Sequence, residues 1–338
     1  MDVPALRSSR QQITRHDFRS PRDVVAWMGA VQAQDPAGVR WALGVRLPPG
    51  SVHETDIERE LDEGRLVRTH VMRFTWQLVA REDLRWMIAL LGPRFLARAA
   101  GYCEQLGLDA KTLTKSQRVL AKALRGGAHL TRVEISDALR GAGIAPEGRL
   151  SLLLGCAELE GILCNGARRG KHPTWALVDE RIPSTKPRSR DDSLRELAKR
   201  YFQSRAPATT ADFVWWSGLA PADARNAMEA AQVDRIAANE RPRQKNEVHL
   251  LPPFDEYLVA YKNRSAVLDD AHVKKINAGG GLLAPTIVEN GLVIGTWRRT
   301  LGKKPVVEHA LFPGRKPSAA TRRAIDEATD RYLRFIER

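Results

Sequence analysis

The sequence predicts an α+β fold built from small modules in tandem, and three observations indicate it. Residues 131–178 are arranged as helix, turn, helix and basic hairpin, which is the order of a winged helix. Residues 194–230 repeat the helical part of this order, and weak self-similarity at this scale favours tandem modules. From Val248 onward, strand-like segments replace the helices, with an Asn290-Gly291 pair typical of a hairpin turn.

Composition limits the class of protein and its partners. The 338 residues are 43% hydrophobic, which is enough for a large core and too long for one simple domain of roughly 100–200 residues. The net charge of +14 comes mostly from arginines spread along the chain. A polyanion is the natural partner, because the arginine fork binds two phosphate oxygens at once. A generally basic surface without a dedicated partner is the alternative.

The sequence predicts no disulfide bonds, no metal site and no membrane-spanning segment. Three cysteines, Cys103, Cys156 and Cys164, are too scattered for a disulfide framework or a zinc site, so we expect core residues in a reducing cytosol. The eight histidines show no metal-binding pattern. The N-terminus lacks the apolar core of a signal peptide, and no apolar run approaches the roughly 20 residues of a membrane span. We therefore expect a cytoplasmic protein, associated with the nucleoid, without metal or cofactor.

The first segment is expected to contain two helices and a hairpin. Ser20 and Pro21 form an N-cap followed by proline at the first helical position, and the apolar spacing continues to Val31. A second helix fits residues 53–62. Residues 65–80 alternate loosely in polarity, which predicts two strands of a hairpin.

The second and third segments carry clear helix signals. Thr131 and Glu134 form a capping box for a helix that begins at residue 132. A longer helix is expected over 148–163, then a turn, a basic loop and a strand over 165–179. In the third segment, helices are expected over 194–203, from 208 to Gly218, and over 222–230. Residues 183–190, rich in proline, arginine, serine and lysine, are the best candidate linker.

The last segment is expected to be rich in strands. Residues 249–261 and 286–299 are predicted to be strands, and 277–285 a loop. The glycine run Gly279, Gly280 and Gly281 could cradle a phosphate, but the run lacks the following helix or GK[ST] signature, so we interpret it as a loop. Residues 318–338 are predicted to be an amphipathic helix.

The stretch VVAWMGAVQAQDPAG, residues 24–38, places two amides, Gln32 and Gln34, at a predicted helix end. Side chains two residues apart point in nearly opposite directions on a helix, at roughly 100° per residue, but share one face of an extended chain. Because Pro36 disfavours helix at Asp35, we expect the helix to loosen near Val31 and present both amides together. Alternatively, Gln34 and Asp35 simply cap and solubilise a helix end.

Four blocks together carry a family resemblance: AVQAQDPAGVRWALGVR, RTHVMRFTWQLVAREDLRWM, LLPPFDEYLVAYKNRS and ENGLVIGTWRR. The chain resembles, over nearly its whole length, the AlkZ/YcaQ-type DNA glycosylases, which are winged-helix DNA-binding-domain proteins. The resemblance implies three tandem winged-helix modules and a small C-terminal β-barrel-like part. The implied boundaries are 1–100 for the first winged helix with the Gln-Ala-Gln motif, 101–182 for the second, 191–245 for the third, and 246–338 for the C-terminal part.

The resemblance also implies an activity. Its members remove N7-alkylated purines, and some unhook interstrand crosslinks. The family motif, a glutamine, an apolar residue and a glutamine, with variants that begin in histidine or end in aspartate, falls on Gln32 and Gln34 as catalytic residues. The implied partner is double-stranded DNA with alkylated bases, and the implied enzyme is a monomer that needs no cofactor. The chain departs from the family pattern at Gln77, where the resemblance would lead us to expect a histidine.

Two amides suit this chemistry for a physical reason. An amide does not titrate near neutral pH, so Gln32 and Gln34 cannot be general bases in the usual sense. An N7-alkylated purine already carries a positive charge and leaves without a strong acid. What remains is to hold a water under the anomeric carbon and to stabilise an oxocarbenium-like sugar, which oriented carbonyl dipoles can do.

Further candidates have structural alternatives. On the predicted hairpin, His70 and Arg73 could contact phosphate or pack in the core. A basic wing tip favours phosphate contact, and its residues are Arg168, Arg169, Lys171 and His172. Asp255 and Glu256 could orient a water or an arginine, or make structural hydrogen bonds.

The alternative function is a non-catalytic winged-helix DNA-binding regulator. It explains the charge and the wings equally well. It gives no reason for the Gln32 and Gln34 pair, and such a regulator would be expected to dimerise with paired recognition helices. A metal-dependent nuclease is a weaker hypothesis, because the sequence has no convincing carboxylate cluster.

Overall fold

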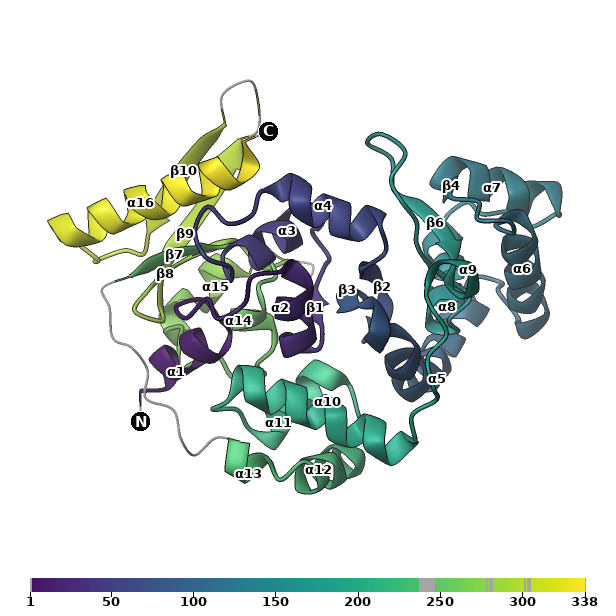
Figure 1. Cartoon of the computed structure of the whole chain (residues 1–338), viewed down its shortest axis with the longest axis horizontal. Helices are drawn as coiled ribbons and strands as arrows, with labels where there is room; N and C mark the ends of the chain where they lie inside the picture. Colours follow the sequence, from purple (N-terminus) through teal and green to yellow (C-terminus); the bar gives the residue numbers. More distant parts are fainter. Residues whose placement is uncertain are drawn as a thin grey trace. The chain divides into compact units, whose positions relative to one another are not determined.

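The computed structural model describes residues 2–236, 247–277, 279, 282–300, 302 and 305–337 (Figure 1). The chain divides into two compact units, one made of residues 1–58 and 195–338 and the other of residues 59–194. Across the described residues, no helix is both long enough and apolar enough to span a membrane.

The first unit begins with short helices around the glutamine stretch. The elements are α1 (Val3–Arg10), α2 (Pro21–Met28), β1 (Val31–Gln32), α3 (Pro36–Gly44) and α4 (Glu54–Asp62), whose last residues belong to the second unit. The Ser20 side chain caps α2 by accepting from the Asp23 N–H, with Pro21 at the first position, as predicted. However, α2 ends at Met28 because Gly29 turns the chain at a φ of 77°, three residues before the predicted loosening.

The helical segment after the linker follows the predicted pattern. Its elements are α10 (Arg190–Arg205), α11 (Thr210–Ser217), α12 (Pro221–Ala230) and α13 (Val233–Ile236). Thr209 and Asp212 form a capping box for α11, and Gly218 ends it in the left-handed conformation. Residues 183–189 before α10 are irregular and exposed, as a linker would be, and Arg190 already belongs to α10. Residues 237–245 of the predicted third winged helix lie outside the described residues.

The C-terminal part of the first unit is an antiparallel sheet. Its strands are β7 (Val248–Leu251), β8 (Thr286–Glu289), β9 (Leu292–Thr300) and β10 (Val306–Leu311), in the order β10-β9-β8-β7. Asn290 and Gly291 form the turn between β8 and β9 at positive φ, as predicted. Within the described strands the sheet is open, with β7 and β10 at its edges, so the expected barrel-like closure is not found.

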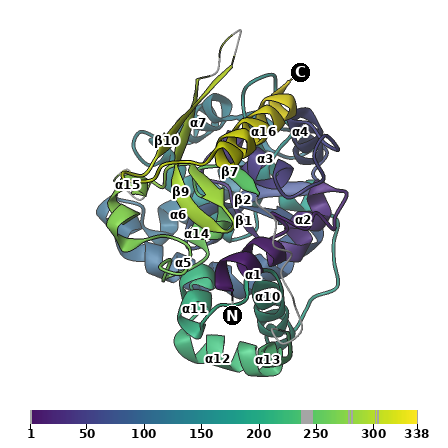
Figure 2. The same ribbon diagram turned by 90° about the vertical axis from the view of Figure 1, so that its left-hand side faces the viewer.

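A helix covers this sheet in place of a closed barrel. Helix α16 (Ala319–Ile336) begins at the capping residue Ser318 and lies against the sheet (Figures 1 and 2). It buries Tyr332 and Phe335 against Trp41 of α3, with both ring centroids 5.1 Å from the indole. Because these aromatic side chains cover the apolar face, the sheet has no need to curl upon itself.

One expected strand is only partly extended, because β7 covers its first residues and a turn of helix follows. Residues 249–261 were predicted to be extended, but α14 (Glu256–Val259) interrupts them. Asp255 starts this turn, because its carboxylate accepts the Tyr257 N–H at 2.9 Å. A short 3₁₀ turn, η1 (Asp270–His272), and α15 (Val273–Ile276) precede the glycine run, of which Gly280 and Gly281 lie outside the described residues.

The second unit contains a hairpin, a long helix and a winged-helix arrangement. The elements are β2 (Leu66–Met72), β3 (Thr75–Ala80), α5 (Arg81–Gln105), α6 (Ala110–Ala123), β4 (Leu130–Thr131), α7 (Arg132–Gly141), α8 (Leu150–Leu159), β5 (Leu163–Asn165), β6 (Thr174–Leu177) and α9 (Val178–Arg181). The predicted hairpin and the capping box of Thr131 and Glu134 are both present. From α6 to β6, the elements follow the winged-helix order, and the three strands pair as β4-β6-β5.

Helices α5 and α8 cross very closely at Gly92. A β-carbon placed on Gly92 would overlap the backbone carbonyl oxygen of Leu159. Gly101, on the same helix, is exposed and has open space around it. The packing of this unit therefore requires a glycine at one position of α5 and tolerates a side chain at the other.

We predict that Gly92→Ala lowers the free energy of unfolding by about 1–3 kcal/mol, because the added methyl must push two helices apart. The matched change Gly101→Ala should be neutral or stabilising by up to about 1 kcal/mol, because alanine is the better helix former. Urea unfolding of both variants measures the difference. Equal stability of the two would contradict the close crossing.

Candidate active site

The two predicted catalytic glutamines have different surroundings. Gln32 ends β1 in extended conformation with 8% of its surface exposed, whereas Gln34 is exposed. Asp35 caps α3, because its Oδ1 accepts the N–H groups of Ala37 and Gly38 at 3.0 and 3.1 Å. Asp35 therefore has a capping role, as the structural alternative held, but it begins the next helix and does not end α2.

A buried ion pair holds the backbone that leads to Gln32. Glu256 accepts the Gln32 N–H at Oε1, 2.8 Å away, and Arg205 Nη2 at Oε2, 2.6 Å away. Arg205 also donates to the carbonyl oxygens of Met28 at 2.7 Å and Ala30 at 2.9 Å. Both charged side chains are 0% exposed. One pair thus satisfies three backbone groups between the end of α2 and the first glutamine.

Aromatic contact completes the surroundings of this pair. The Trp216 indole N–H donates to Glu256 Oε2 at 3.1 Å, and its ring centroid lies 4.6 Å from the Arg205 guanidinium carbon. A buried charge is tolerated only when it is paired and hydrogen-bonded, and here both are. The Arg205–Glu256 pair is therefore a rigid anchor for β1.

The neighbouring carboxylate, Asp255, forms a second buried pair. It binds Arg46 through two hydrogen bonds, at 2.7 Å to Nη2 and 2.8 Å to Nη1, and Arg46 also donates to the Ala42 carbonyl at 2.7 Å. In contrast to Glu256, Asp255 makes its hydrogen bonds to Arg46 and to the N–H of Tyr257, away from residues 28–34. Two of the alternatives left open by the sequence apply to both carboxylates, because each orients an arginine and each also accepts a structural hydrogen bond from a backbone N–H.

Arg46 and Arg205 were not singled out from the sequence. The available signal was the pair of adjacent acids, Asp255 and Glu256, between apolar residues. Such acids in a core require cationic partners, but the sequence does not say which of the 54 lysines and arginines supply them.

In the second unit, His70 lies in the core. It is 7% exposed, and its Nδ1 and its backbone N–H lie 2.6 and 2.8 Å from Glu158 Oε2. Glu158 is fully buried and also accepts the Trp175 indole N–H at 2.7 Å. Arg73 occupies the hairpin turn at a φ of 53° and is half-buried, and Gln77 is buried on β3. DNA contact by His70 and Arg73 stays a prediction.

The predicted wing tip gathers its basic residues between β5 and β6. Arg168 binds both carboxylate oxygens of Asp62, with Nη2 2.7 Å from Oδ2, and Arg169 binds Glu134 at 2.6 Å. Burial opposes ionisation of Asp62, but the Arg168 hydrogen bonds and charge prevail and lower its pKa. Hydrogen bonds from Thr131 and Arg169 lower the pKa of Glu134 to about 2. The two arginines are thus paired with ionised carboxylates, while Lys171 is exposed.

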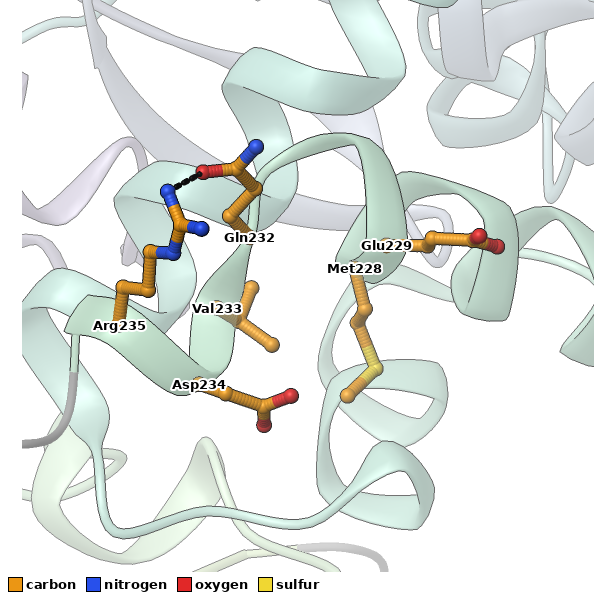
Figure 3. A pocket seen from close by; sticks show the side chains of 6 residues that line it. All are labelled: Met228, Glu229, Gln232, Val233, Asp234 and Arg235. Atoms are coloured by element: carbon orange, nitrogen blue, oxygen red, sulfur yellow. Dashed lines mark hydrogen bonds between the residues drawn. The ribbon is translucent and has the colours of Figure 1, made fainter.

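Two hollows of the described surface lie away from the glutamines. A hollow of about 440 Å³ lies over α12 and α13, where Gln232 accepts from Arg235 at 2.8 Å (Figure 3). Another, of about 540 Å³, lies beside His272 and Phe312. Neither is lined by Gln32 or Gln34. In the part of the chain that the structure describes, no three histidine, cysteine, aspartate or glutamate side chains are grouped so as to hold a metal ion.

Comparison with known proteins identifies the family. The family model described as "DNA glycosylase AlkZ-like" matches residues 25–335. The chain belongs to the AlkZ-like DNA glycosylase family. This AlkZ-like glycosylase is an enzyme that acts on DNA, as the sequence resemblance implied.

A curated sequence and a solved structure from Streptomyces sahachiroi are both similar to this chain. A protein named "Interstrand DNA cross-link repair glycosylase" is 24% identical over 326 residues, which cover 87% of this chain and 86% of the relative. The solved structure of the DNA glycosylase AlkZ superposes with a TM-score of 0.79 at 20% identity, over 99% of this chain and 95% of that one. The AlkZ-like glycosylase therefore shares its fold over nearly the whole chain.

We predict that Asp255→Asn and Glu256→Gln each lower the free energy of unfolding by about 3–5 kcal/mol, because each leaves a buried arginine without its charge partner. Asp62→Asn breaks a pair that is about one-third exposed and should cost under about 1 kcal/mol. Denaturant unfolding compares the three variants. A similar loss for all three would contradict the special role of the buried pairs.

Proposed function

We propose that this enzyme is a monofunctional DNA glycosylase that hydrolyses the bond between deoxyribose and N7-alkylated purines in duplex DNA. We extend the proposal to interstrand crosslinks made through N7, which the name of the 24% identical relative supports. The observation that carries the proposal is the anchoring of Gln32, because Glu256 and Arg205 hold the first glutamine of the family's motif at the end of β1.

The alkylated purine is its own leaving group. Alkylation at N7 places a positive charge on the base, and cleavage of the C1′–N9 bond returns the bonding electrons to the ring and neutralises it. No protein acid is needed for this step. The sugar becomes oxocarbenium-like, and attack by water at C1′ followed by loss of a proton to solvent completes the hydrolysis.

The two amides are proposed to act on the water and on the sugar. Their carbonyl oxygens accept hydrogen bonds from a water at C1′ and place negative dipole ends near the developing positive charge. Gln34, which is exposed, can meet the water directly, while Gln32 is held from behind by its backbone bond to Glu256. Orientation in advance lowers the entropy that must be lost in the transition state.

Electrostatics also explains why a motif of neutral side chains suits this reaction. A cation beside the glutamines would oppose the positive sugar in the transition state. Arg205 approaches this segment, but Glu256 compensates its charge at 2.6 Å. The pair therefore positions the backbone without adding net charge near the proposed reaction centre.

The finer architecture belongs to the same proposal. A repair enzyme that binds duplex DNA would have three winged-helix modules, with the boundaries predicted from the resemblance, and would act as a monomer. It would contact phosphates through His70, Arg73, Arg168, Arg169 and Lys171. Membership of a glycosylase family favours this enzyme over the non-catalytic regulator.

The substrate is tested by incubating the full chain with duplex DNA that contains one N7-methylguanine, with EDTA present. We expect release of the free base and an abasic site that is cut only by later alkali treatment. An unmodified duplex is the control, and a duplex crosslinked through N7 tests unhooking. Absence of base release from every N7 adduct would refute the proposal.

We predict that Gln32→Ala and Gln34→Ala each slow single-turnover excision by roughly 10²–10³-fold, because each removes one positioned dipole. The double variant should be little worse than either single one, since one water held by one amide is already misplaced. Gln34→Asp should retain more activity than Gln34→Ala, because a carboxylate still accepts from water. Wild-type excision rates in both alanine variants, with DNA affinity and melting temperature measured alongside, would exclude these glutamines from catalysis.

We predict that Glu256→Gln slows excision at least 10-fold per folded molecule, while Asp255→Asn does not, although both remove a buried charge. Displacement of β1 by a fraction of an ångström misplaces Gln32, and a misplacement of about 1 Å can cost roughly 10²-fold in rate. Arg205→Lys and Arg46→Lys form a gentler pair, because lysine keeps the charge but loses the planar fork that binds several acceptors at once. If the two variants of each pair excised the base at equal rates, the Arg205–Glu256 pair would have no specific role in catalysis.

A further inference from the structure

Helix α6 of the second unit carries an exposed row of positive charges. Its four cations are Lys111, Lys115, Arg118 and Lys122, all exposed. Their spacing of four, three and four residues places them on one face of the helix. The opposite face buries Ser116 and Leu120 in the core of this unit. We call the four residues the α6 basic face.

Helix α6 itself contains no acidic residue to balance this face. The sequence of α6, AKTLTKSQRVLAKA, contains no aspartate or glutamate. The preceding Asp109 is committed to the N-cap, where it accepts the Thr112 N–H at 2.7 Å. Among the described helices of eight or more residues, no other one combines four cations with the absence of any acid.

Such an arrangement works against the helix itself. Neighbouring like charges at three- and four-residue spacing repel one another, and Lys111 lies in the first turn, where the helix dipole already disfavours a cation. Surface helices that serve only for solubility usually alternate the signs of their charges. Helix α16 does so, with Arg322 and Arg323 followed by Asp326 and Glu327. The α6 basic face therefore suits an external polyanion.

The wing tip offers less free charge than its sequence suggests. Arg168 and Arg169 are bound to Asp62 and Glu134, so a phosphate must compete with a carboxylate already in place. In the part of the chain that the structure describes, none of the four α6 cations forms a hydrogen bond or ion pair with a carboxylate, and only Lys111 interacts with one through its charge, that of Asp109. Counterion release is the main sequence-independent source of affinity for DNA.

The dimensions of the face fit a duplex backbone. Lys111 and Lys122 are 11 residues apart, which is about 16 Å along the axis at about 1.5 Å per residue. A DNA strand advances about 3.4 Å along the duplex axis per phosphate, so a backbone that follows the helix offers several phosphates within this span. The long lysine and arginine stems let the charges adjust to their positions.

We propose that the α6 basic face binds the phosphate backbone of duplex DNA without regard to sequence or damage. It forms a contact surface separate from the wing and from the glutamine motif, and it holds undamaged DNA as firmly as damaged DNA. The inference rests on the proposed function only in taking duplex DNA as the substrate.

The test measures affinity for an undamaged duplex of about 30 base pairs across a range of salt concentrations, using the full chain. Lys111, Lys115, Arg118 and Lys122 are changed together to glutamine, which keeps helix propensity. The matched control changes Lys316, Arg322, Arg323 and Arg334 to glutamine; all four are exposed in the first unit. Each variant loses four charges, so the formal net charge falls from +14 to +10 in both.

We expect the slope of log affinity against log salt to become shallower by about 3 in the α6 variant, at roughly 0.9 per lost phosphate contact, and by less than about 1 in the control. Equal slopes in the two variants would overturn the proposal, because only net charge would then matter. Equally, a melting temperature that falls together with an unchanged slope would assign these residues to folding. Failure of the wild type to release N7-methylguanine would refute the proposed function but leave these slopes readable.

Discussion

The buried Arg205–Glu256 ion pair is the interaction on which the geometry of the glutamine motif depends. It joins the end of α10 to the start of α14, and through hydrogen bonds to Met28, Ala30 and Gln32 it holds the backbone between α2 and α3. Two charges withdrawn from water are tolerated only when nearly every donor and acceptor is used. Because these hydrogen bonds require specific directions, the ion pair fixes the position of the Gln32 backbone.

The second pair, Arg46–Asp255, shows that this unit buries more than one ion pair. Of the two pairs, the Arg205–Glu256 pair is the one that holds the backbone of the glutamine motif. The two acids are adjacent in sequence, yet Asp255 binds an arginine of the segment after α3 and Glu256 binds one of α10. Because α14 presents both acids to the core, it acts as a junction between the N-terminal helices and the later part of the unit. A conventional strand at this position would place the two side chains on opposite faces of a sheet.

The positions of the charges carry information that the net charge does not. A net charge of +14 indicates a polyanion as partner, but it does not say which cations are available to one. In the wing, Arg168 and Arg169 lie beside ionised carboxylates, whereas the α6 basic face has none in its helix. The surface that meets DNA therefore depends on pairing between segments, which only the fold reveals.

Local signals in the sequence determined many of the elements. The caps at Ser20 and Thr131, the hairpin after Arg65 and the Asn290-Gly291 turn all form as predicted, because each satisfies its hydrogen bonds within a few residues of itself. The Gln-Ala-Gln motif was also recognisable, since it is a contiguous pattern.

Only the tertiary structure decided the rest. The partner of the Gln32 N–H is 224 residues away along the chain, and the partner of the Ala30 carbonyl is 175 residues away. The covering of an open sheet by α16 likewise follows from contacts between distant segments. The end of α2 at Gly29 and the turn of helix at Glu256 have local causes, a glycine at positive φ and the Asp255 cap, which the sequence pattern alone did not reveal. Local propensity is a matter of a few tenths to about 1 kcal/mol per residue, whereas an unpaired buried charge costs several times more, so the long-range partners prevail wherever the two disagree.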